Sequence, residues 1–373
     1  MAGGVAAVLL VGAIAGIAGA VGGSRSTSGS GRGEDSAWMH DLASHLSNRK
    51  LSDIVIPGSH DTGTYSLDPA INDDAITQSE DLIHQLDDGA REFDIRVRAT
   101  KGGYYLNHGE AVSPWLRLNR IFKDVSEWAT NKPGSAGAGP GPRDQEIIML
   151  NLTIDGGVPT ADCQSFGQQL GDALVTPNVL QAQFGTSDPG QVTLRQLWSL
   201  PNPKRAARVI MDNSPCLSAA DPFAGHWNPD LPFGKGDSQS YYANQCSASG
   251  LEDQPPDPPT QGIGIWPRVS SAVKSRSTDG IGPAPPTSFG PAMVGGVYTL
   301  FIQGTPDDLS DVCNIDPAKM LPDEKTVLAR LVAQWRKDPN TKANLEVVSG
   351  DFVQKTDLVS DVLAMDETSP KAP

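Results

Sequence analysis

Residues 53–65 read DIVIPGSHDTGTY, and the interpretation of the whole chain starts from this stretch. Residues 54–56 are two isoleucines flanking a valine, which predicts a buried β-strand. A Pro-Gly pair follows and is expected to end the strand, so that His60 and Asp61 lie in the loop directly after it. Loops at the ends of buried strands hold reactive side chains rigidly and within reach of a ligand. The stretch therefore predicts a functional site around His60.

The composition of the 373-residue chain limits the classes of protein to consider. Its hydrophobic content of 38% is enough for one large domain or two modest ones, and 39 glycines with 30 prolines indicate many loops. The net charge of −15 argues against a nucleic-acid-binding protein. It also predicts that any contact with an anionic membrane is local. We expect a monomer.

The N-terminal region predicts export. Residues 1–21 contain an apolar run and a small-residue cleavage site at Ala18–Ala20, although no Lys or Arg precedes Arg25. A cleaved signal peptide is expected, with an uncleaved anchor as the alternative, and hence a secreted, extracellular or cell-surface protein. Residues 22–36 then form a Gly/Ser-rich linker, residues 37–366 one folded domain, and residues 367–373 a disordered tail.

The four cysteines show no spacing typical of a zinc site. In an exported protein they predict one or two disulfides, with three possible pairings. A bond between Cys216 and Cys246 is favoured because they flank a loop-like stretch, and four free buried thiols are the alternative. The other two cysteines are Cys163 and Cys313.

Apolar runs alternate with helix-like segments along the rest of the chain. The runs that predict strands are residues 91–97, 103–108, 146–154, 207–212, 297–303 and 345–352. The segments that predict helices are residues 38–51, 116–131, 160–175 and 326–339. This alternation predicts βα units around a parallel sheet or barrel. Pro/Gly-rich stretches at residues 131–143, 253–262 and 279–291 are interpreted as surface insertions within that domain.

The strand GAREFDIRVRA, residues 89–99, has one apolar and one charged face, because successive side chains of a strand point to opposite sides. The charged face consists of Glu92, Asp94, Arg96 and Arg98. A parallel strand is normally apolar on both faces. This face is therefore predicted to be solvated or to line a polar site, with an exposed edge strand as the alternative.

The stretch GGYYLNHGE, residues 102–110, places a second imidazole, His108, at the end of a predicted strand. In a βα barrel the C-terminal ends of the strands form the catalytic face. His60, His108 and Arg96 there would supply a base, an acid and a clamp for an anion. The remaining histidines are expected to have ordinary structural roles: His40, His45, His84 and His226.

Four stretches together resemble the X-region of phosphatidylinositol-specific phospholipase C, particularly the small bacterial-type enzymes. They are LSDIVIPGSHDTGTY (51–65), GAREFDIRVR (89–98), YYLNHG (104–109) and, more weakly, EIIMLNL (146–152), in the family's order. The resemblance covers about residues 38–155. It returns at DPNTKANLEVVSGDF (338–352), which resembles the last barrel strand with its acidic partner for the first histidine.

The resemblance implies a single distorted (β/α)8 TIM barrel that acts on a phospholipid at a membrane interface by a ribonuclease-like mechanism. His60 would be the general base on the inositol 2-hydroxyl, and His108 the general acid on the diacylglycerol oxygen. Asp351 would hold the tautomer of His60, Asp61 would support proton transfer at His108, and Arg96 would neutralise phosphate charge. Diacylglycerol and a cyclic inositol phosphate would be the products.

The resemblance also bears on cofactors and on substrate contacts. In calcium-dependent relatives, acidic residues near this strand hold the metal, whereas Arg96 places a fixed positive charge there, so no metal and no cofactor are expected. Asp94, Arg96 and Asn151 are the predicted substrate contacts. The residues that contact inositol in the middle of the barrel have no clear counterpart, since Asp212 stands where a basic residue is expected. Three aromatic residues could stack on the headgroup or simply pack: Tyr241, Tyr242 and Trp266.

Other functions stay open at this point. The chain could cleave another phospholipid or a glycosylphosphatidylinositol headgroup. A metal-dependent phosphodiesterase of the glycerophosphodiester type is disfavoured by Arg96. A catalytically inactive barrel that only binds its ligand is disfavoured because His60, Asp61, Arg96 and His108 are all present.

Overall fold

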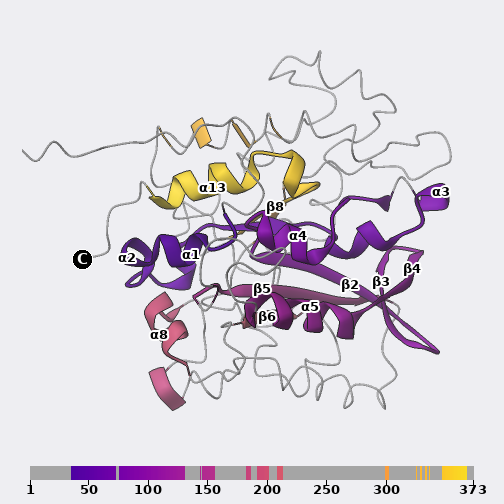
Figure 1. The fold of residues 1–373 in the computed structure, drawn as a ribbon, viewed down its shortest axis with the longest axis horizontal. Coiled ribbons are helices and arrows are strands. Elements are labelled where there is room, and N and C mark those ends of the chain that lie inside the picture. Colours follow the sequence, from indigo (N-terminus) through magenta and orange to yellow (C-terminus); the bar gives the residue numbers. More distant parts are fainter. Residues whose placement is uncertain are drawn as a thin grey trace, which may run out of the picture. The chain divides into compact units, whose positions relative to one another are not determined.

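One mixed sheet forms the centre of the described part of this computed structural model (Figure 1). The structure describes residues 35–72, 75–130, 143, 145–155, 182–185, 191–200, 208–212, 299–301, 325, 328–329, 332–333, 336 and 347–367. The strands of the sheet are β1 (Ile56–Ser59), β2 (Glu92–Thr100), β3 (Gly103–His108), β4 (Ala111–Arg117), β5 (Ile148–Asp155), β6 (Arg208–Asp212), β7 (Thr299–Phe301) and β8 (Val347–Gly350). Every strand predicted from the apolar runs is therefore present.

The order of the parallel strands is that of a βα barrel. They pair as β7-β8-β1-β2-β5-β6, so that the last described strand of the chain lies beside the first. Such pairing of last and first strands is what closes a (β/α)8 barrel on one side. The predicted α/β class is confirmed, and the sheet is mixed, because β3 and β4 are antiparallel additions to the parallel strands. Closure between β6 and β7 would involve residues 213–298, which lie outside the described residues, so the complete barrel stays a prediction.

Helices connect the parallel strands, as crossover connections require. The helices are α1 (Trp38–Asp41), α2 (Ala43–Leu46), α3 (Pro69–Asn72), α4 (Leu82–Asp87), α5 (Leu118–Thr130), α8 (Leu194–Ser199) and α13 (Leu358–Glu367). Short 3₁₀ turns are η1 (Leu51–Asp53), η2 (Thr62–Ser66) and η8 (Val353–Lys355). Within this part of the chain, none of the helices has the length and apolar character needed to cross a membrane.

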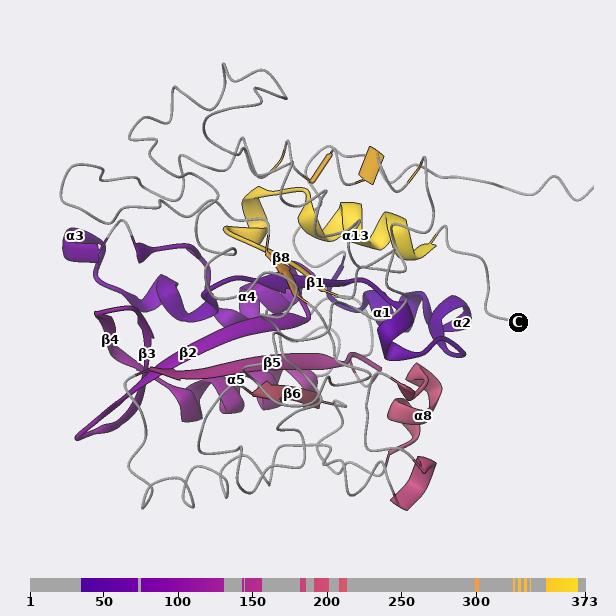
Figure 2. The ribbon, with the colours of Figure 1, turned by 180° about the vertical axis from the view of Figure 1, so that it is seen from behind.

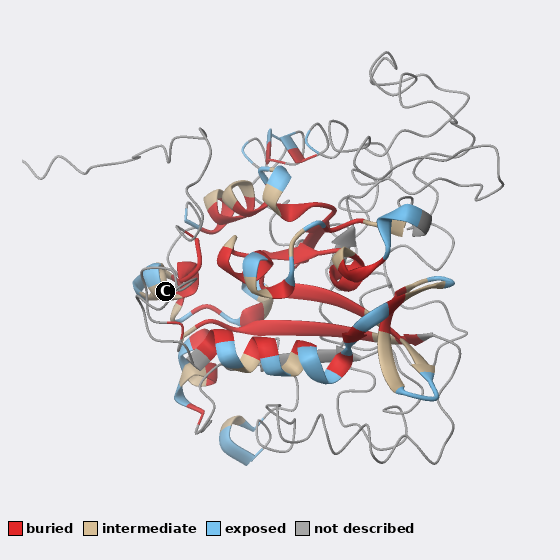
Figure 3. Ribbon diagram, turned by 45° about the vertical axis from the view of Figure 1, so that its right-hand side comes forward, coloured by how far each residue is buried: buried red, intermediate tan, exposed pale blue. Residues whose placement is uncertain are grey.

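The apolar face of β2 packs against α5, which runs along β2 and β5 (Figures 1 and 2). Phe93, Ile95 and Val97 form a buried cluster with α5 residues at helical spacing, among them Ile121 and Trp128. Burial of each such side chain is worth about 1.5–3 kcal/mol. The strands at the centre are mostly buried, with β2 becoming more exposed toward Thr100, whereas α5 alternates between buried and exposed positions (Figure 3). This packing fixes β2, and with it the direction of its charged side chains.

A second apolar cluster anchors the strands that carry the other half of the site. Ile56 of β1 and Val347 of β8 pack with Val359 and Leu363 of α13, and with Trp38 of α1. Helix α13 lies beside β1 and β8 in both views (Figures 1 and 2). The C-terminal helix therefore holds the first and last strands together.

The expectation that Pro57 and Gly58 end the first strand is wrong. Both belong to β1, which pairs with β8 on one side and with β2 on the other. The Pro57 carbonyl accepts the Arg91 backbone N–H at 2.9 Å. Gly58 is required for space, because a Cβ there would collide with the Glu92 carboxyl. The Pro-Gly pair is thus part of the sheet and not a turn.

The strand that ends at His108 also differs from expectation. β3 is antiparallel to β2 and forms a hairpin with β4, a strand that was not predicted. Pro114 in the middle of β4 hid the strand in the sequence, because proline cannot donate to a strand ladder and is normally read as a break. Since β3 runs back along β2, His108 reaches the site from a returning strand and not from a matching parallel strand end.

Several predictions concern residues outside the described ranges. They include residues 1–34 and 368–373, the predicted helix at 160–175, all four cysteines, and the aromatic candidates Tyr241, Tyr242 and Trp266. The export signal, the disulfides and the stacking residues stay predictions.

Candidate active site

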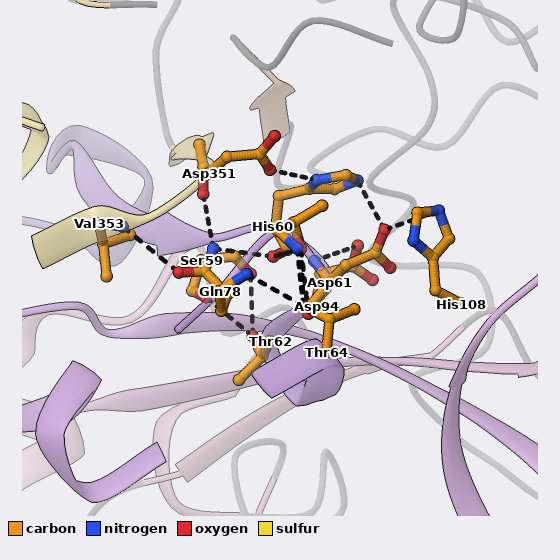
Figure 4. A network of polar contacts seen from close by, with 12 residues as sticks. Ser59, His60, Asp61, Thr62, Thr64, Gln78, Asp94, His108, Asp351 and Val353 are labelled. Atoms are coloured by element: carbon orange, nitrogen blue, oxygen red, sulfur yellow. Dashed lines mark hydrogen bonds and ion pairs between the residues drawn. The ribbon is translucent and has the colours of Figure 1, made fainter. Parts of the chain in front are cut away.

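Four segments bring the predicted catalytic residues together, and Figure 4 shows His60, Asp61, His108 and Asp351 among them. His60 and Asp61 follow β1, Arg96 lies in β2, His108 ends β3, and Asp351 follows β8. All five are linked by polar contacts of 3.5 Å or less. The structure therefore unites residues that are as many as 291 positions apart in the sequence.

Asp351 binds the inner nitrogen of His60. Its Oδ1 lies 2.7 Å from Nδ1 of His60, and the side chains are almost wholly buried. A carboxylate in that position accepts a proton from Nδ1, which fixes the ring orientation and leaves Nε2 to face the site. The contact between Asp351 and His60 that the resemblance implied is present, and the role of Asp351 in catalysis stays a prediction.

Two strained residues aim this pair. Asp61 and Phe352, each next to a member of the pair, both have φ of 44°, in the left-handed region. Asp tolerates this conformation, whereas a bulky residue such as Phe adopts it at a cost of about 1–3 kcal/mol. Strain of this kind persists only where surrounding contacts hold it. Here it turns the chain sharply just after β1 and β8.

Asp61 is the centre of the constellation. Its Oδ2 lies 3.1 Å from Nε2 of His60 and 3.5 Å from Nε2 of His108, and its Oδ1 lies 2.7 Å from Nε of Arg96. The backbone N–H of Asp61 donates to Asp94 at 3.2 Å. Both imidazoles therefore direct the same ring nitrogen toward one carboxylate oxygen.

Arg96 connects the carboxylates to the first histidine. Its Nη2 lies 2.9 Å from Oδ2 of Asp94 and 3.2 Å from Nε2 of His60. The Arg96 side chain is 27% exposed, whereas those of Asp61 and Asp94 are buried. A guanidinium held in this way presents its charge toward the open side of the site.

His108 is held by one backbone contact. Its Nδ1 lies 2.9 Å from the carbonyl oxygen of Ala75, so Nδ1 carries a proton and donates to it. Nε2 is thereby directed at Asp61. The His108 side chain is 30% exposed and that of His60 only 7%, so the two imidazoles differ in access to solvent.

The charges of the cluster shift its proton affinities. Burial alone would lower the pKa of His60, but attraction to Asp61 and Asp351 and the hydrogen bond to Asp351 outweigh it, so the pKa is raised above the ordinary 6.5. Burial would raise the pKa of Asp61, but Arg96 and the two histidines hold it below its usual value. Asp61 is therefore a carboxylate over the working pH range.

Three residues of the site carry side chains of the kind that bind metal ions. Ligand atoms of His60, Asp61 and Asp94 lie within 4.8 Å of one another, close enough for a cation. Arg96 already forms ion pairs with both carboxylates, at 2.7 and 2.9 Å, and its fixed charge would repel a dication. The donor set therefore does not suit a metal ion, although independence from metals stays a prediction.

The charged face of β2 points into the sheet's concave interior. The alternative of a wet edge strand is wrong, because β2 pairs with β1, β3 and β5, and Glu92 and Asp94 are buried. Asn151, a predicted substrate contact, is buried on β5 in register with Asp94. It lies near Glu92, whose pKa is raised well above its usual range by burial and then by Asp94. Neither residue contacts the histidines.

The described histidines expected to be structural lie elsewhere. His40 contacts Gln145, His45 contacts the Asp366 carbonyl, and His84 pairs with Asp81 on the surface. Sequence reasoning missed Gln78 and Thr77, which contact the backbone of His60, because no motif distinguishes them from other polar residues.

Comparisons with known proteins identify relatives of part of this chain. No model of a known protein family matches the chain. The 1-phosphatidylinositol phosphodiesterase of Staphylococcus aureus is 40% identical over 97 residues, which is 26% of this chain and 30% of that protein. The human PI-PLC X domain-containing protein 2 is 27% identical over 143 residues, 31% of this chain and 42% of that protein. The chain thus spans less than half the length of these curated relatives.

The fold agrees over a longer stretch. A solved double mutant of the phosphatidylinositol-specific phospholipase C from S. aureus superposes with a TM-score of 0.55 at 18% identity, covering 92% of this chain and 100% of that one. At this identity the likeness shows the fold alone. Taken with the sequence matches, it shows that the chain is related to the phosphatidylinositol-specific phospholipase C X-region family, as its four motifs predicted.

Proposed function

We propose that this chain is a phospholipase C-type phosphodiesterase that cleaves phosphatidylinositol without a metal, with His60 and His108 as general base and general acid. The observation that carries the proposal is the convergence of both Nε2 atoms on Oδ2 of Asp61, at 3.1 and 3.5 Å, beside the guanidinium of Arg96. Phosphoryl transfer of this kind requires one proton to be removed and another to be supplied. Two imidazoles directed at the same carboxylate oxygen suit this requirement, and the half-buried Arg96 guanidinium beside them suits the charge of the phosphate.

The chemistry balances without an external reagent. His60 takes the proton of the inositol 2-hydroxyl as its oxygen forms a bond to phosphorus. The bond from phosphorus to the glycerol oxygen breaks, and His108 gives that oxygen its proton. Diacylglycerol and a cyclic inositol phosphate result, so the reaction is that of a lyase. Arg96 stabilises the charge on the non-bridging phosphate oxygens in the transition state.

The difference in burial between the two histidines supports this division of roles. His60 is buried and lies against Asp351, so its Nε2 can serve only a group that enters the site deeply, such as a headgroup hydroxyl. His108 and Arg96 are about 30% exposed, on the side from which a lipid must approach. A leaving group that stays in the membrane would meet His108 first. The base is thus placed for the headgroup and the acid for the lipid.

The partner would be a phospholipid surface. Trp115 in β4 is 58% exposed, and it is the large hydrophobic side chain that stands out to solvent among the described residues. It lies against the ring of Tyr65 in η2, directly after the catalytic loop, with ring centroids 6.1 Å apart. An indole at that position suits an interface between water and lipid. Export of the protein, suggested by residues 1–21, belongs to the same proposal.

The test is cleavage of phosphatidylinositol vesicles in excess chelator, followed by phosphorus NMR. A cyclic phosphodiester as the first product supports the proposal. Parallel samples of phosphatidylcholine and of a glycosylphosphatidylinositol distinguish the headgroups. Turnover of these lipids but not of phosphatidylinositol would refute the proposed substrate, and binding without turnover of any lipid would refute an enzymatic role.

A further inference from the structure

A buried glutamine joins the two strand ends that carry His60 and Asp351. The Nε2 of Gln78 donates to the carbonyl of His60 at 2.9 Å and to the carbonyl of Gly350 at 3.1 Å. Its Oε1 accepts the backbone N–H of Val353 at 3.3 Å. The side chain thus binds the backbone of one catalytic residue and the backbone on both sides of the other. Figure 4 shows it between the two segments.

Both N–H groups and the oxygen of the Gln78 side-chain amide are hydrogen-bonded. Both N–H groups face carbonyl oxygens and the oxygen faces an N–H, so the orientation of the amide is determined by its partners. Gln78 is fully buried, and water does not replace these bonds. No other residue type of similar size supplies two donors and one acceptor in this geometry.

The glutamine is itself held in place by neighbouring threonines. Its backbone N–H donates to Oγ1 of Thr64 at 3.0 Å. Oγ1 of Thr77 lies 2.9 Å from the same Thr64 oxygen, and the Thr77 carbonyl accepts the N–H of Phe352 at 2.8 Å. Phe352 is the strained residue after Asp351. The segment 77–78 therefore restrains both left-handed turns that aim the catalytic pair.

We propose that Gln78 is a positioning residue, which holds the ends of β1 and β8 at the separation at which His60 and Asp351 form their hydrogen bond. The bond is 2.7 Å long and joins loops that directly follow the two strands. A small increase in separation of the loops would break it. That Gln78 preserves the His60–Asp351 hydrogen bond follows from the geometry alone. That loss of this bond lowers activity rests on the proposed role of His60 as general base.

The consequence can be derived from the groups around His60. Asp61 faces it from its own loop, Asp351 from β8, and Arg96 from β2, while His108 and Asp94 act through their contacts with these side chains. Without the hydrogen bond to Asp351, burial and Arg96 still oppose protonation of His60, and the charges of Asp61 and of a more distant Asp351 favour it less than before. The pKa of His60 is then expected to fall by about one unit, the scale of one hydrogen bond to a charged group.

Gln85 provides a matched control. It is equally buried, and its side chain also binds the β1 end, through the Ser59 hydroxyl at 2.6 Å and the Thr62 carbonyl at 3.2 Å. None of its partners belongs to β8 or to the loop with Asp351. Gln85→Met should therefore destabilise the protein much as Gln78→Met does, without changing the His60–Asp351 bond.

The experiment is an NMR titration of the histidine side chains in the full chain, with His60 assigned by comparison with His60→Ala. The account predicts that Gln78→Met lowers the His60 pKa by about one unit and abolishes the low-field signal of the Nδ1 proton. Gln85→Met should leave both unchanged. An unchanged His60 in Gln78→Met, or equal shifts in both variants, would overturn the proposal.

A second variant and the independence of the titration from any substrate complete the experiment. If Gln78→Met does not fold, Gln78→Asn keeps the amide but shortens its reach by one methylene, and the same criteria apply. Because the titration needs no substrate, the shift can appear even if phosphatidylinositol is not cleaved, which would reject the proposed function alone. Lipid cleavage with an unchanged titration would reject only the positioning role.

Discussion

Nη2 of Arg96 lies 3.2 Å from Nε2 of His60. A guanidinium can only donate, so in this contact Nε2 carries a lone pair and His60 is neutral. The same Nε2 lies 3.1 Å from a carboxylate oxygen of Asp61, which can only accept a proton. The protonation state of His60 therefore selects its partner: Arg96 when neutral, Asp61 when charged. His60 therefore has a favourable partner both before and after it takes a proton: the Arg96 cation while it is neutral, and the Asp61 anion once it is charged.

The first prediction is a rise of kcat/KM with pH whose midpoint lies above 6.5. His60 must be neutral to act as base, and its pKa is raised by Asp61 and Asp351 despite its burial. Asp351→Asn removes one of these charges, so the midpoint should move to lower pH while kcat falls. A pH–rate profile of wild type and variant measures both. A midpoint that does not respond to Asp351 would mean that another group limits the acidic side.

The same titration affects stability in a defined direction. Because the folded-state pKa of His60 is raised, its protonation stabilises the fold fully below the unfolded pKa near 6.5. That contribution is lost as the pH rises through the folded-state pKa. Denaturant unfolding of wild type and His60→Ala should therefore differ more at pH 5 than at pH 9.

The second prediction concerns Arg96 and metals. Activity should persist in excess chelator, because the guanidinium takes the place between Asp61 and Asp94 that a dication would need. Arg96→Ala should lower kcat by about 10²–10³, the usual loss when one donor to a developing oxyanion is removed. Arg98→Ala, on the same strand but paired with the exposed Glu110, is the control and should change kcat little. Activity lost in chelator and restored by calcium would contradict this account.

The third prediction concerns the buried carboxyl under the site. The raised pKa of Glu92 means that the folded protein holds its proton more tightly than the unfolded chain does. Stability then declines as the pH rises from the unfolded pKa near 4.5 toward the higher folded value. Glu92→Gln should remove this decline and raise the free energy of unfolding by about 1–3 kcal/mol at pH 9. Parallel pH dependences in both proteins would show that Glu92 is not neutral in the fold.

The fourth prediction separates docking from chemistry. Trp115→Ala should weaken binding to phospholipid vesicles, because the exposed indole is lost from the edge of the site. Turnover of a soluble, short-chain substrate should be unchanged, since Trp115 contacts none of the catalytic residues named above. Sedimentation with vesicles gives the first quantity and the soluble assay the second. Equal losses in both assays would assign Trp115 a structural role.

The strands, and the positions of His60, Arg96 and His108 beside them, could be predicted from the sequence because the signals are local, whereas Asp351 was predicted from the family resemblance. Short runs of β-branched residues reveal buried strands, and the alternation in β2 revealed two unlike faces. His60 and Arg96 were recognisable because they follow or interrupt such patterns. The fold class followed from the alternation of strands and helices alone.

What could not be predicted depends on contacts between distant segments. Gly58 belongs to β1 because it pairs with β2 and β8, where a Cβ would meet the Glu92 carboxyl, and neither neighbour is visible in the local sequence. The hairpin of β3 and β4 was hidden because Pro114 lies in the middle of β4, where a proline argues against a strand. Gln78 forms its hydrogen bonds where the ends of β1 and β8 meet, and these two strands are nearly 300 residues apart in the sequence. Its hydrogen bonds could not be inferred from any local pattern.

The measurement that tests the central claim most directly compares His60→Ala and His108→Ala on two substrates. One is phosphatidylinositol, and the other is an inositol phosphodiester with a nitrophenol leaving group, which departs without protonation. The account predicts that both variants lose turnover of the lipid, and that the activated substrate restores turnover in His108→Ala but not in His60→Ala. Restoration in His60→Ala instead, or equal behaviour of the two variants, would contradict the division of roles between base and acid.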